Sequence, residues 1–227
     1  MKPFLILCPL KLEMNALVAE LEAKGFEFLD EQKSGLTLKK ESKGSFYVAV
    51  GGHGKVQFAL STLHFLMEFP NLQGVISVGS AGALSPEVHV GHVVVSEAVV
   101  EHDHKLLYVS RPLPRFSGGK RFLEVLKDSQ LDFENGNLHF GLIASGDEDV
   151  MEWERAQEIF KQTHALAVAW EGAGGARACE YKKLPFMEIR GITDIADENV
   201  VTDFSTNLKL VFPRLAQVVI ALAERLG

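Results

Sequence analysis

The segment Ala165–Asp197, which reads ALAVAWEGAGGARACEYKKLPFMEIRGITDIAD, decides how the rest of the chain is interpreted. It contains two short apolar runs separated by a stretch rich in small residues. A continuous apolar run closed by polar residues is typical of a strand buried on both faces. A strand, a helix and a second strand within about thirty residues form a βαβ unit, whose ligands lie at the carboxyl ends of the strands. We therefore expect Glu171 and Asp194 to end neighbouring strands on the same edge of a sheet, as the chemical centre of the protein.

Length, charge and cysteine content limit the class of protein. The chain has 227 residues, 47% hydrophobic and 23% charged, which is ordinary for a globular domain with a full core. Its formal net charge of -7 argues against a nucleic-acid partner, because neutralising phosphates requires clustered Lys and Arg. We expect Cys8 and Cys179 to be buried free thiols in a reducing compartment, with a disulfide between them as the alternative. The N-terminal apolar run is too short to span a membrane and lacks a cleavage pattern, so we expect a cytoplasmic protein without a membrane partner.

The rest of the chain alternates between apolar strands and helices. Strands are expected over residues 4–7, 36–39, 46–50, 74–78, 92–100 and 138–144. Helices are expected over residues 13–23, 56–67, 122–126, 152–162 and 207–226, with Pro213 at a kink or in the first turn of the last one. A long loop is expected over residues 104–119. No linker or repeat interrupts this order, so residues 1–227 are predicted to form one domain.

Several short motifs follow predicted strands, and each has a structural interpretation beside the functional one. Gly51–Lys55 lacks the flanking residues of a Walker A motif, so a tight strand-to-helix turn is expected. Gly79–Gly82 would let a ligand approach the backbone closely, but alone it favours a crowded turn. His102–His104 offers too few converging ligands for a metal, and Asp147–Asp149 lacks the spacing of a calcium loop, so we expect no metal and a solvated loop at 147–149.

In this order the motifs resemble those of the nucleoside phosphorylase and nucleosidase superfamily, and most closely those of the methylthioadenosine/S-adenosylhomocysteine nucleosidases. The resemblance covers almost the whole chain and rests on Glu13, Gly52–Val56, Val78–Leu84, Val90–Ser96, His102–Asp103, Ser145–Asp147, Glu171–Ala173 and Arg190–Asp197. It implies an α/β, single-domain nucleoside phosphorylase-like fold with a central mixed β-sheet flanked by helices. It also implies a homodimer without a cofactor that takes a small-molecule nucleoside as its substrate.

The resemblance further implies the role of particular residues. Asp194 matches the general acid that protonates N7 of the purine, and Glu171 matches the carboxylate that binds the ribose hydroxyls. Glu13 matches the acid that orients and deprotonates the attacking water, helped by Arg190. The expected substrate-binding residues are Ser80, Ala81, Gly82, Val150, Trp170 and Thr193. The implied reaction is hydrolysis of the N-glycosidic bond of 5′-methylthioadenosine or S-adenosylhomocysteine, with release of adenine, as in methionine salvage.

The chemistry of this bond suits these residue types. Cleavage builds positive charge on the sugar and pushes electrons into the base. A positioned acid that protonates the base accelerates the reaction by about 10²–10⁴-fold. A carboxyl group with an ordinary pKa of ~3.9 must be shifted upward by roughly three units to hold its proton at neutral pH, which burial can achieve. Without the resemblance, Asp194 would be interpreted as a strand-end cap, Glu171 as a neighbour of a helix N-cap and Glu13 as a first-turn acid.

Departures from the family pattern leave alternatives open. Relatives usually carry Glu-Met-Glu where this chain has Ala169-Trp170-Glu171, and Asp149 stands where an aromatic residue usually stacks on the adenine. Futalosine hydrolases share the fold, and Pro185–Gly191 resembles their sequence, but they generally have Asn where Asp194 stands. A purine nucleoside phosphorylase would need arginines that this chain lacks at the matching positions. The remaining alternative is a non-catalytic nucleoside-binding protein.

Overall fold

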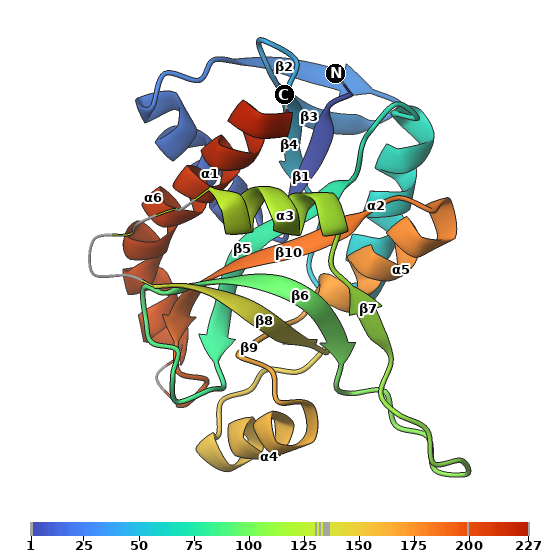
Figure 1. Ribbon diagram of the computed structural model, residues 1–227, viewed down its shortest axis with the longest axis vertical. Helices are drawn as coiled ribbons and strands as arrows, with labels where there is room; N and C mark the ends of the chain where they lie inside the picture. The colour runs from blue at the N-terminus through green and yellow to red at the C-terminus, as the bar shows by residue number, and fades with distance from the viewer. Residues whose placement is uncertain (1, 130, 132, 134–136, 199, 227) are drawn as a thin grey trace.

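The computed structural model describes residues 2–129, 131, 133, 137–198 and 200–226, apart from the side chains of residues 200 and 201. In this part of the chain, helices flank a mixed sheet (Figure 1), which confirms the expected α/β class. The strands are β1 Phe4–Cys8, β2 Phe28–Lys33, β3 Leu36–Glu41, β4 Phe46–Val50, β5 Val75–Ala83, β6 Val93–Glu101, β7 Arg115–Ser117, β8 Leu138–Ser145, β9 Ala167–Ala169 and β10 Phe186–Asp194. The helices are α1 Lys11–Ala23, α2 Lys55–Glu68, α3 Lys120–Asp128, α4 Trp153–Thr163, α5 Gly172–Lys182 and α6 Val200–Leu226.

Five of the strands close into a ring, and the others extend from it. The sheet order is β10-β6-β8-β9-β5-β1-β4-β3-β2, and β10 also pairs with β5, which closes the ring β10-β6-β8-β9-β5. The strand β5 runs parallel to β1 and β10, whereas β9 runs antiparallel to β5. The polar ends of β5, β9 and β10 are thereby brought to one region of the molecule.

The prediction that Glu171 and Asp194 end neighbouring parallel strands is wrong. In the described sheet β9 pairs with β8 and β5, so β5 lies between β9 and β10. Because β9 runs against β10, Glu171 at its end lies beside Arg190, four positions before Asp194 on β10. An apolar run identifies a strand, but it does not tell which strand lies beside it.

The Gly79–Gly82 segment also differs from the prediction. It continues β5 to Ala83 instead of forming a turn after residue 78. A Cβ on Gly79 would lie 2.6 Å from Nη1 of Arg190 and 2.9 Å from Oε1 of Glu13. The glycine therefore permits the close approach of two charged side chains to an extended backbone, which any residue could otherwise adopt.

Other differences concern polar segments. The edge strand β2 is largely exposed, and the short β7 lies within the expected loop over residues 104–119, so neither has a clear apolar signal. The helix α6 begins at Val200, whereas the sequence predicted a start at residue 207. The apolar pattern did not reveal the first turns, because their described side chains are mostly polar and exposed. Pro213 lies inside α6, so its placement in the first turn is wrong.

Apart from α4, which contacts β8, the helices pack in two groups against the sheet. The helix α1 contacts α6, and α2 contacts α5 on the other side of the sheet (Figure 1). Leu17 and Leu21 of α1 are buried, as their spacing predicted, and so are the two free thiols of Cys8 and Cys179. By length and composition α6 could span a membrane, but 56% of its apolar window is buried in the protein, as in the core helix of a globular domain.

Candidate active site

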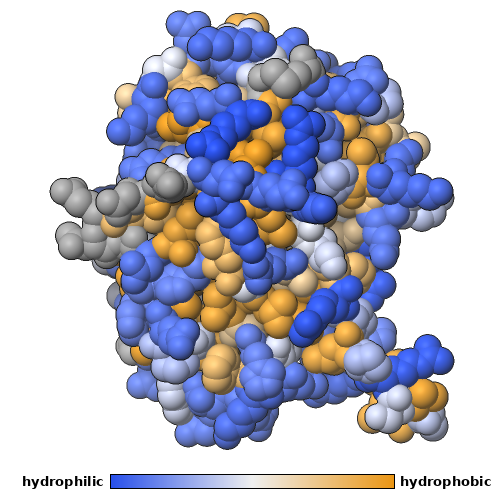
Figure 2. Space-filling view, in the orientation of Figure 1, coloured by the Kyte–Doolittle hydropathy of each residue, from blue (hydrophilic) through white to orange (hydrophobic). Residues whose placement is uncertain are grey.

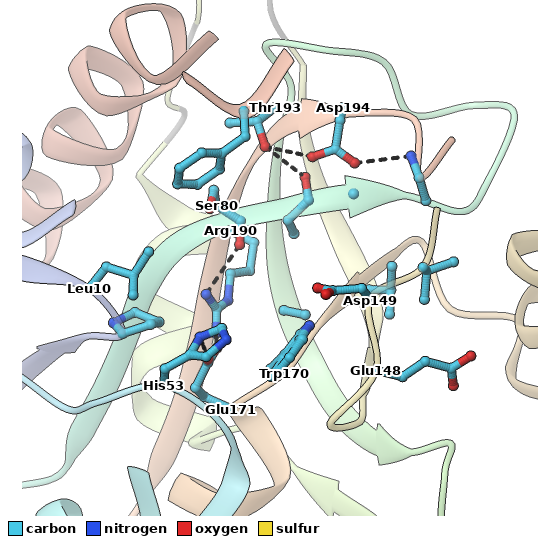
Figure 3. Close-up of a pocket in the computed structure, with 18 of the residues that line it drawn as sticks. Leu10, His53, Ser80, Glu148, Asp149, Trp170, Glu171, Arg190, Thr193 and Asp194 are labelled. Atoms are coloured by element: carbon cyan, nitrogen blue, oxygen red, sulfur yellow. Dashed lines mark hydrogen bonds and ion pairs between the residues drawn. The ribbon is translucent and has the colours of Figure 1, made fainter. Parts of the chain in front are cut away.

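A pocket lies where β5, β9, β10 and the start of α1 meet, and Figure 3 shows how the side chains enter it. Every residue that the sequence assigned to the site lines this pocket: Glu13, Ser80, Ala81, Gly82, Val150, Trp170, Glu171, Arg190, Thr193 and Asp194. They come from five separate regions of the chain. The closed ring of strands brings them together.

Glu13 is held in the pocket by three hydrogen bonds. The N–H and Oγ–H of Ser80 both donate to its Oε1 at 2.8 Å, and the N–H of Leu10 donates to its Oε2 at 3.1 Å. Its third position in α1 lets the carboxylate reach back to the helix start, as in a capping box. Burial raises the pKa of Glu13, while the nearby Arg190 and the bonds from Ser80 lower it. The net effect is a raised pKa, so Glu13 holds a proton to a higher pH than an exposed glutamate does.

The Arg190 guanidinium connects the two sides of the pocket. Its Nη1 donates to the carbonyl oxygen of Ser80 at 3.1 Å, and its Nη2 donates to Oε2 of Glu171 at 3.0 Å. Its Nε donates to Oε1 of Glu188 at 2.7 Å, a residue that does not line the pocket. Arg190 is only 1% exposed, so these charge-assisted bonds lie in a region shielded from water.

Asp194 occupies a different electrostatic setting. Its Oδ2 lies 2.8 Å from the hydroxyl of Thr193, and its Oδ1 accepts the N–H of Ala196 at 3.0 Å (Figure 3). Burial raises the pKa of Asp194, and the bonds from Thr193 and Ala196 lower it less. A Cβ on Gly82 would lie 2.7 Å from Oδ1, so β5 must carry a glycine beside this carboxyl group. Asp194 can therefore hold a proton at a higher pH than an exposed aspartate.

Glu171 receives contacts from the glycine loop that precedes α2. Gly54 donates its N–H to Oε1 at 3.2 Å, and Nδ1 of His53 lies 3.4 Å from the same oxygen. The ring of His53 stacks on Trp170 with centroids 4.1 Å apart (Figure 3). The carbonyl of Trp170 accepts a bond from Ser145, whose oxygen accepts the N–H of Ala173. The two hydrogen bonds of Ser145 thus fix the turn between β9 and α5.

The glycine loop is a strand-to-helix turn, as the sequence predicted, and ion pairs anchor it. The Nζ of Lys55 binds Glu101 at 2.9 Å and Asp103 at 2.6 Å, while its N–H donates to Asp147 at 2.7 Å. These contacts tie the start of α2 to the ends of β6 and β8. No group of three His, Cys, Asp or Glu side chains among the described residues is arranged to hold a metal ion.

Sequence reasoning missed part of the lining. The additional residues are Pro9, Leu10, His53, Glu148, Asp149, Met151, Val168, Ala169, Ala196 and Phe204. Residues 147–149 form a loop in which Asp147 and Asp149 are exposed, as expected, but the loop also contributes to the site, because Glu148 and Asp149 line the pocket and Asp147 anchors Lys55. The location of His53 in the glycine loop was the available signal that it could line the pocket. A turn alone, however, does not reveal which way a side chain points.

The arrangement supplies two kinds of acid–base chemistry. Glu13, with Ser80 and Arg190, forms a polar corner where a water molecule can be held and deprotonated. Asp194 offers a buried carboxyl group that can donate a proton. Two carboxyl groups whose environments differ in this way are typical of a site in which one acts as a base and the other as an acid.

Known proteins resemble this chain in sequence and in fold. Residues 3–224 match the family described as the Phosphorylase superfamily. A 5′-methylthioadenosine/S-adenosylhomocysteine nucleosidase of Thermotoga maritima is 33% identical over 205 residues, which cover 89% of each chain. A mutant nucleosidase of Helicobacter pylori, solved with 5′-methylthioadenosine in the active site, superposes with a TM-score of 0.87 at 25% identity over the whole of both chains. Futalosine hydrolase of Helicobacter pylori gives a TM-score of 0.86 at 24% identity over 99% of this chain and 98% of that one, a likeness of fold.

Proposed function

The chain belongs to the phosphorylase superfamily, and we propose that it is a nucleosidase that hydrolyses the N-glycosidic bond of 5′-methylthioadenosine or S-adenosylhomocysteine and releases adenine. The observation that carries the proposal is the pairing of two buried carboxyl groups in one pocket. Glu13 lies beside a cation and accepts hydrogen bonds from one hydroxyl and two backbone N–H groups, whereas the hydrogen-bond partners of Asp194 among the described residues are neutral. This difference suits a base at the sugar and an acid at the purine.

Asp194 is the proposed general acid. As the bond to the sugar breaks, electrons move into the purine, and protonation at N7 turns the base into a neutral leaving group. Because burial raises its pKa, Asp194 keeps a proton to transfer at a pH where an exposed aspartate has lost it. The hydroxyl of Thr193 and the N–H of Ala196 then stabilise the carboxylate that remains.

Glu13 is the proposed base for water, with Arg190 as its helper. The carboxylate accepts the proton of the attacking water as it bonds to the anomeric carbon. The nearby guanidinium lowers the pKa of Glu13, because an opposite charge favours the carboxylate, and so it counteracts the rise that burial causes. The Oγ of Ser80, 2.8 Å from Glu13, marks where the water would be held.

Glu171 is the proposed anchor of the sugar. A carboxylate accepts hydrogen bonds from two neighbouring hydroxyls more strongly than a neutral group does. Arg190 holds one of its oxygens, while Gly54 and His53 approach the other, so its orientation is set before substrate binds. Ser80, Ala81, Gly82, Val150, Trp170 and Thr193 would surround the base and the ribose.

Hydrolysis is favoured over phosphorolysis by the cations of the pocket. Arg190 is the only arginine or lysine among the described lining residues. Its guanidinium is already bound by Glu171, Glu188 and the carbonyl of Ser80. A phosphate ion would need a free bidentate donor, which this pocket does not offer.

A panel assay with and without phosphate tests the proposal. We expect the purified protein to release adenine from 5′-methylthioadenosine and S-adenosylhomocysteine at a rate that phosphate does not change. A dependence on phosphate would make it a phosphorylase, and a preference for futalosine would make it a futalosine hydrolase. Substrate binding without release of base would make it a non-catalytic nucleoside-binding protein.

We also propose that residues 1–227 act as one domain in a homodimer, in the cytoplasm and in methionine salvage. Support for a second copy comes from exposed apolar side chains. The loop between β6 and β7 projects from the body (Figure 1), carries apolar surface (Figure 2), and leaves Leu107 89% and Tyr108 99% exposed. On α2, Val56, Leu60 and Met67 form a second exposed apolar stripe.

A further inference from the structure

Three buried carboxyl groups surround one guanidinium, and the proposed chemistry uses only two of them. Glu13 and Glu171 line the pocket, whereas Glu188 is 0% exposed and lies outside the set of lining residues. The three carboxyl groups would carry three negative charges against the single positive charge of Arg190. Such an excess is costly in a region shielded from water, so the presence of Glu188 needs a reason.

Glu188, which does not line the pocket, holds one edge of the Arg190 guanidinium. The two residues are two positions apart on β10, so their side chains lie on the same face of the strand. Oε1 of Glu188 accepts from Nε at 2.7 Å and lies 2.6 Å from Nη2. Contact with two nitrogens on one edge fixes the plane of the guanidinium and not only its position.

The hydrogen bonds of Arg190 leave one donor free. A guanidinium has five N–H groups. The Nε hydrogen goes to Glu188, and one hydrogen on Nη1 goes to the carbonyl of Ser80. The two hydrogens on Nη2 are shared among Glu188, Glu171 and the more distant Ser77. The second Nη1 hydrogen has no hydrogen-bond acceptor among the described residues. Nη1 and Oε1 of Glu13 together occupy the space that a Cβ at Gly79 would need.

The space for Glu188 is maintained by a glycine. A Cβ on Gly172, at the start of α5, would lie 2.0 Å from Oε2 of Glu188. That oxygen is buried and has no hydrogen-bond partner in the described part of the chain. Burial raises the pKa of Glu188, which Arg190 partly offsets. A well-packed apolar side chain would serve stability at least as well, so the carboxyl group is better explained by what it does to Arg190.

We propose that Glu188 is a positioning residue: it holds the guanidinium of Arg190 so that the free Nη1–H is directed at the water that Glu13 deprotonates. This inference rests on the proposed hydrolysis. The carboxyl group touches neither substrate nor water, and it acts through the orientation of Arg190 alone. Its loss should therefore slow the chemical step more than it weakens substrate binding.

The test compares Glu188→Leu, which removes the acceptor, with Glu188→Gln, which keeps an acceptor oxygen of the same reach. For Glu188→Leu we expect kcat for 5′-methylthioadenosine to fall about 10²-fold, as for a reacting group displaced by about 1 Å, while KM changes little. Glu188→Gln should retain most of kcat. Glu124→Leu, at an exposed glutamate of α3, is the matched control and should leave both constants unchanged.

If Glu188→Leu does not fold, a second variant still tests the inference. Gly172→Ala places a methyl group against Oε2 and should displace Glu188, which again lowers kcat. A displaced Glu171 would instead raise KM, so the two effects are separable. Folded variants with unchanged kcat would overturn the inference, as would equal losses in Glu188→Gln and Glu188→Leu. A wild-type protein that releases no base would refute the proposed function, and the inference would fall with it.

Discussion

At the scale of single residues, burial acts on two carboxyl groups and their neighbours decide the outcome. Burial is the largest influence on both pKa values and raises them. Glu13 then has Arg190 and two bonds from Ser80 to favour its charged form, whereas Asp194 has the hydroxyl of Thr193 and the N–H of Ala196. A cation favours ionisation more than neutral donors do, so the same pocket can hold a base and an acid.

The role of Asp194 as general acid predicts a specific loss on substitution. In Asp194→Asn the amide cannot protonate N7, so kcat should fall by about 10²–10⁴ while the pocket keeps its shape. Release of adenine under saturating substrate measures this effect. Asp30→Asn, at an exposed aspartate of β2, is the control and should remain fully active. Near-normal turnover of Asp194→Asn would show that the proton comes from elsewhere.

The opposite requirements of the two acids predict a bell-shaped pH profile. Activity should fall as the pH drops through the pKa of Glu13, because the base becomes protonated, and as it rises through the pKa of Asp194, because the acid loses its proton. Profiles of kcat/KM should therefore lose the acid limb in Glu13→Gln and the basic limb in Asp194→Asn, in the activity that remains. An unchanged profile in either variant would remove that residue from the assignment.

At the scale of elements, the sequence predicted the residues of the site better than their arrangement. Glu13, Gly82 and Asp194 were identifiable because each lies in a short motif at the end or start of an element. The position of β5 between β9 and β10 was not identifiable, because pairing depends on contacts far apart in the sequence. The lining role of Met151 escaped for a similar reason, since a loop residue has no periodicity that shows which side it faces.

The contact between α2 and α5 yields a prediction about stability and binding. A Cβ on Gly174 would lie 2.1 Å from the backbone oxygen of Lys55, which cannot move aside alone. Gly174→Ala should therefore destabilise the protein by about 1–3 kcal/mol, and it should raise KM by shifting the loop that holds Glu171. Denaturant unfolding and steady-state kinetics measure the two effects. Tyr181→Ala, at an exposed position of α5, serves as control, and a variant as stable as wild type would mean that the helices separate freely.

At the scale of the whole molecule, the projecting loop predicts how copies associate. If Leu107 and Tyr108 pack against a second copy, a charge at Leu107 would be buried without a partner. Leu107→Asp should therefore shift the protein from two copies towards one in light scattering, and it should lower activity if the loop completes the neighbouring pocket. Lys105→Ala in the same loop should leave both properties unchanged. A wild-type protein that is a single copy at assay concentrations would contradict the proposed dimer.

Asp194 also affects the stability of the whole protein. The raised pKa that suits its proposed role as an acid lowers the free energy of unfolding at neutral pH. Because burial raises the pKa of Asp194, the folded protein holds this proton more tightly than the unfolded chain does. The resulting stabilisation is complete below the unfolded pKa of ~3.9 and is lost as the pH rises through the folded pKa. Asp194→Asn never ionises, so it should be more stable than wild type at neutral pH, with a difference that shrinks as the pH falls towards about 4. Urea unfolding across this pH range measures the difference, with Asp30→Asn as the control for the substitution itself. A difference that stays constant at every pH would mean that Asp194 titrates normally, and the proton that the proposed mechanism takes from it would then be absent at neutral pH.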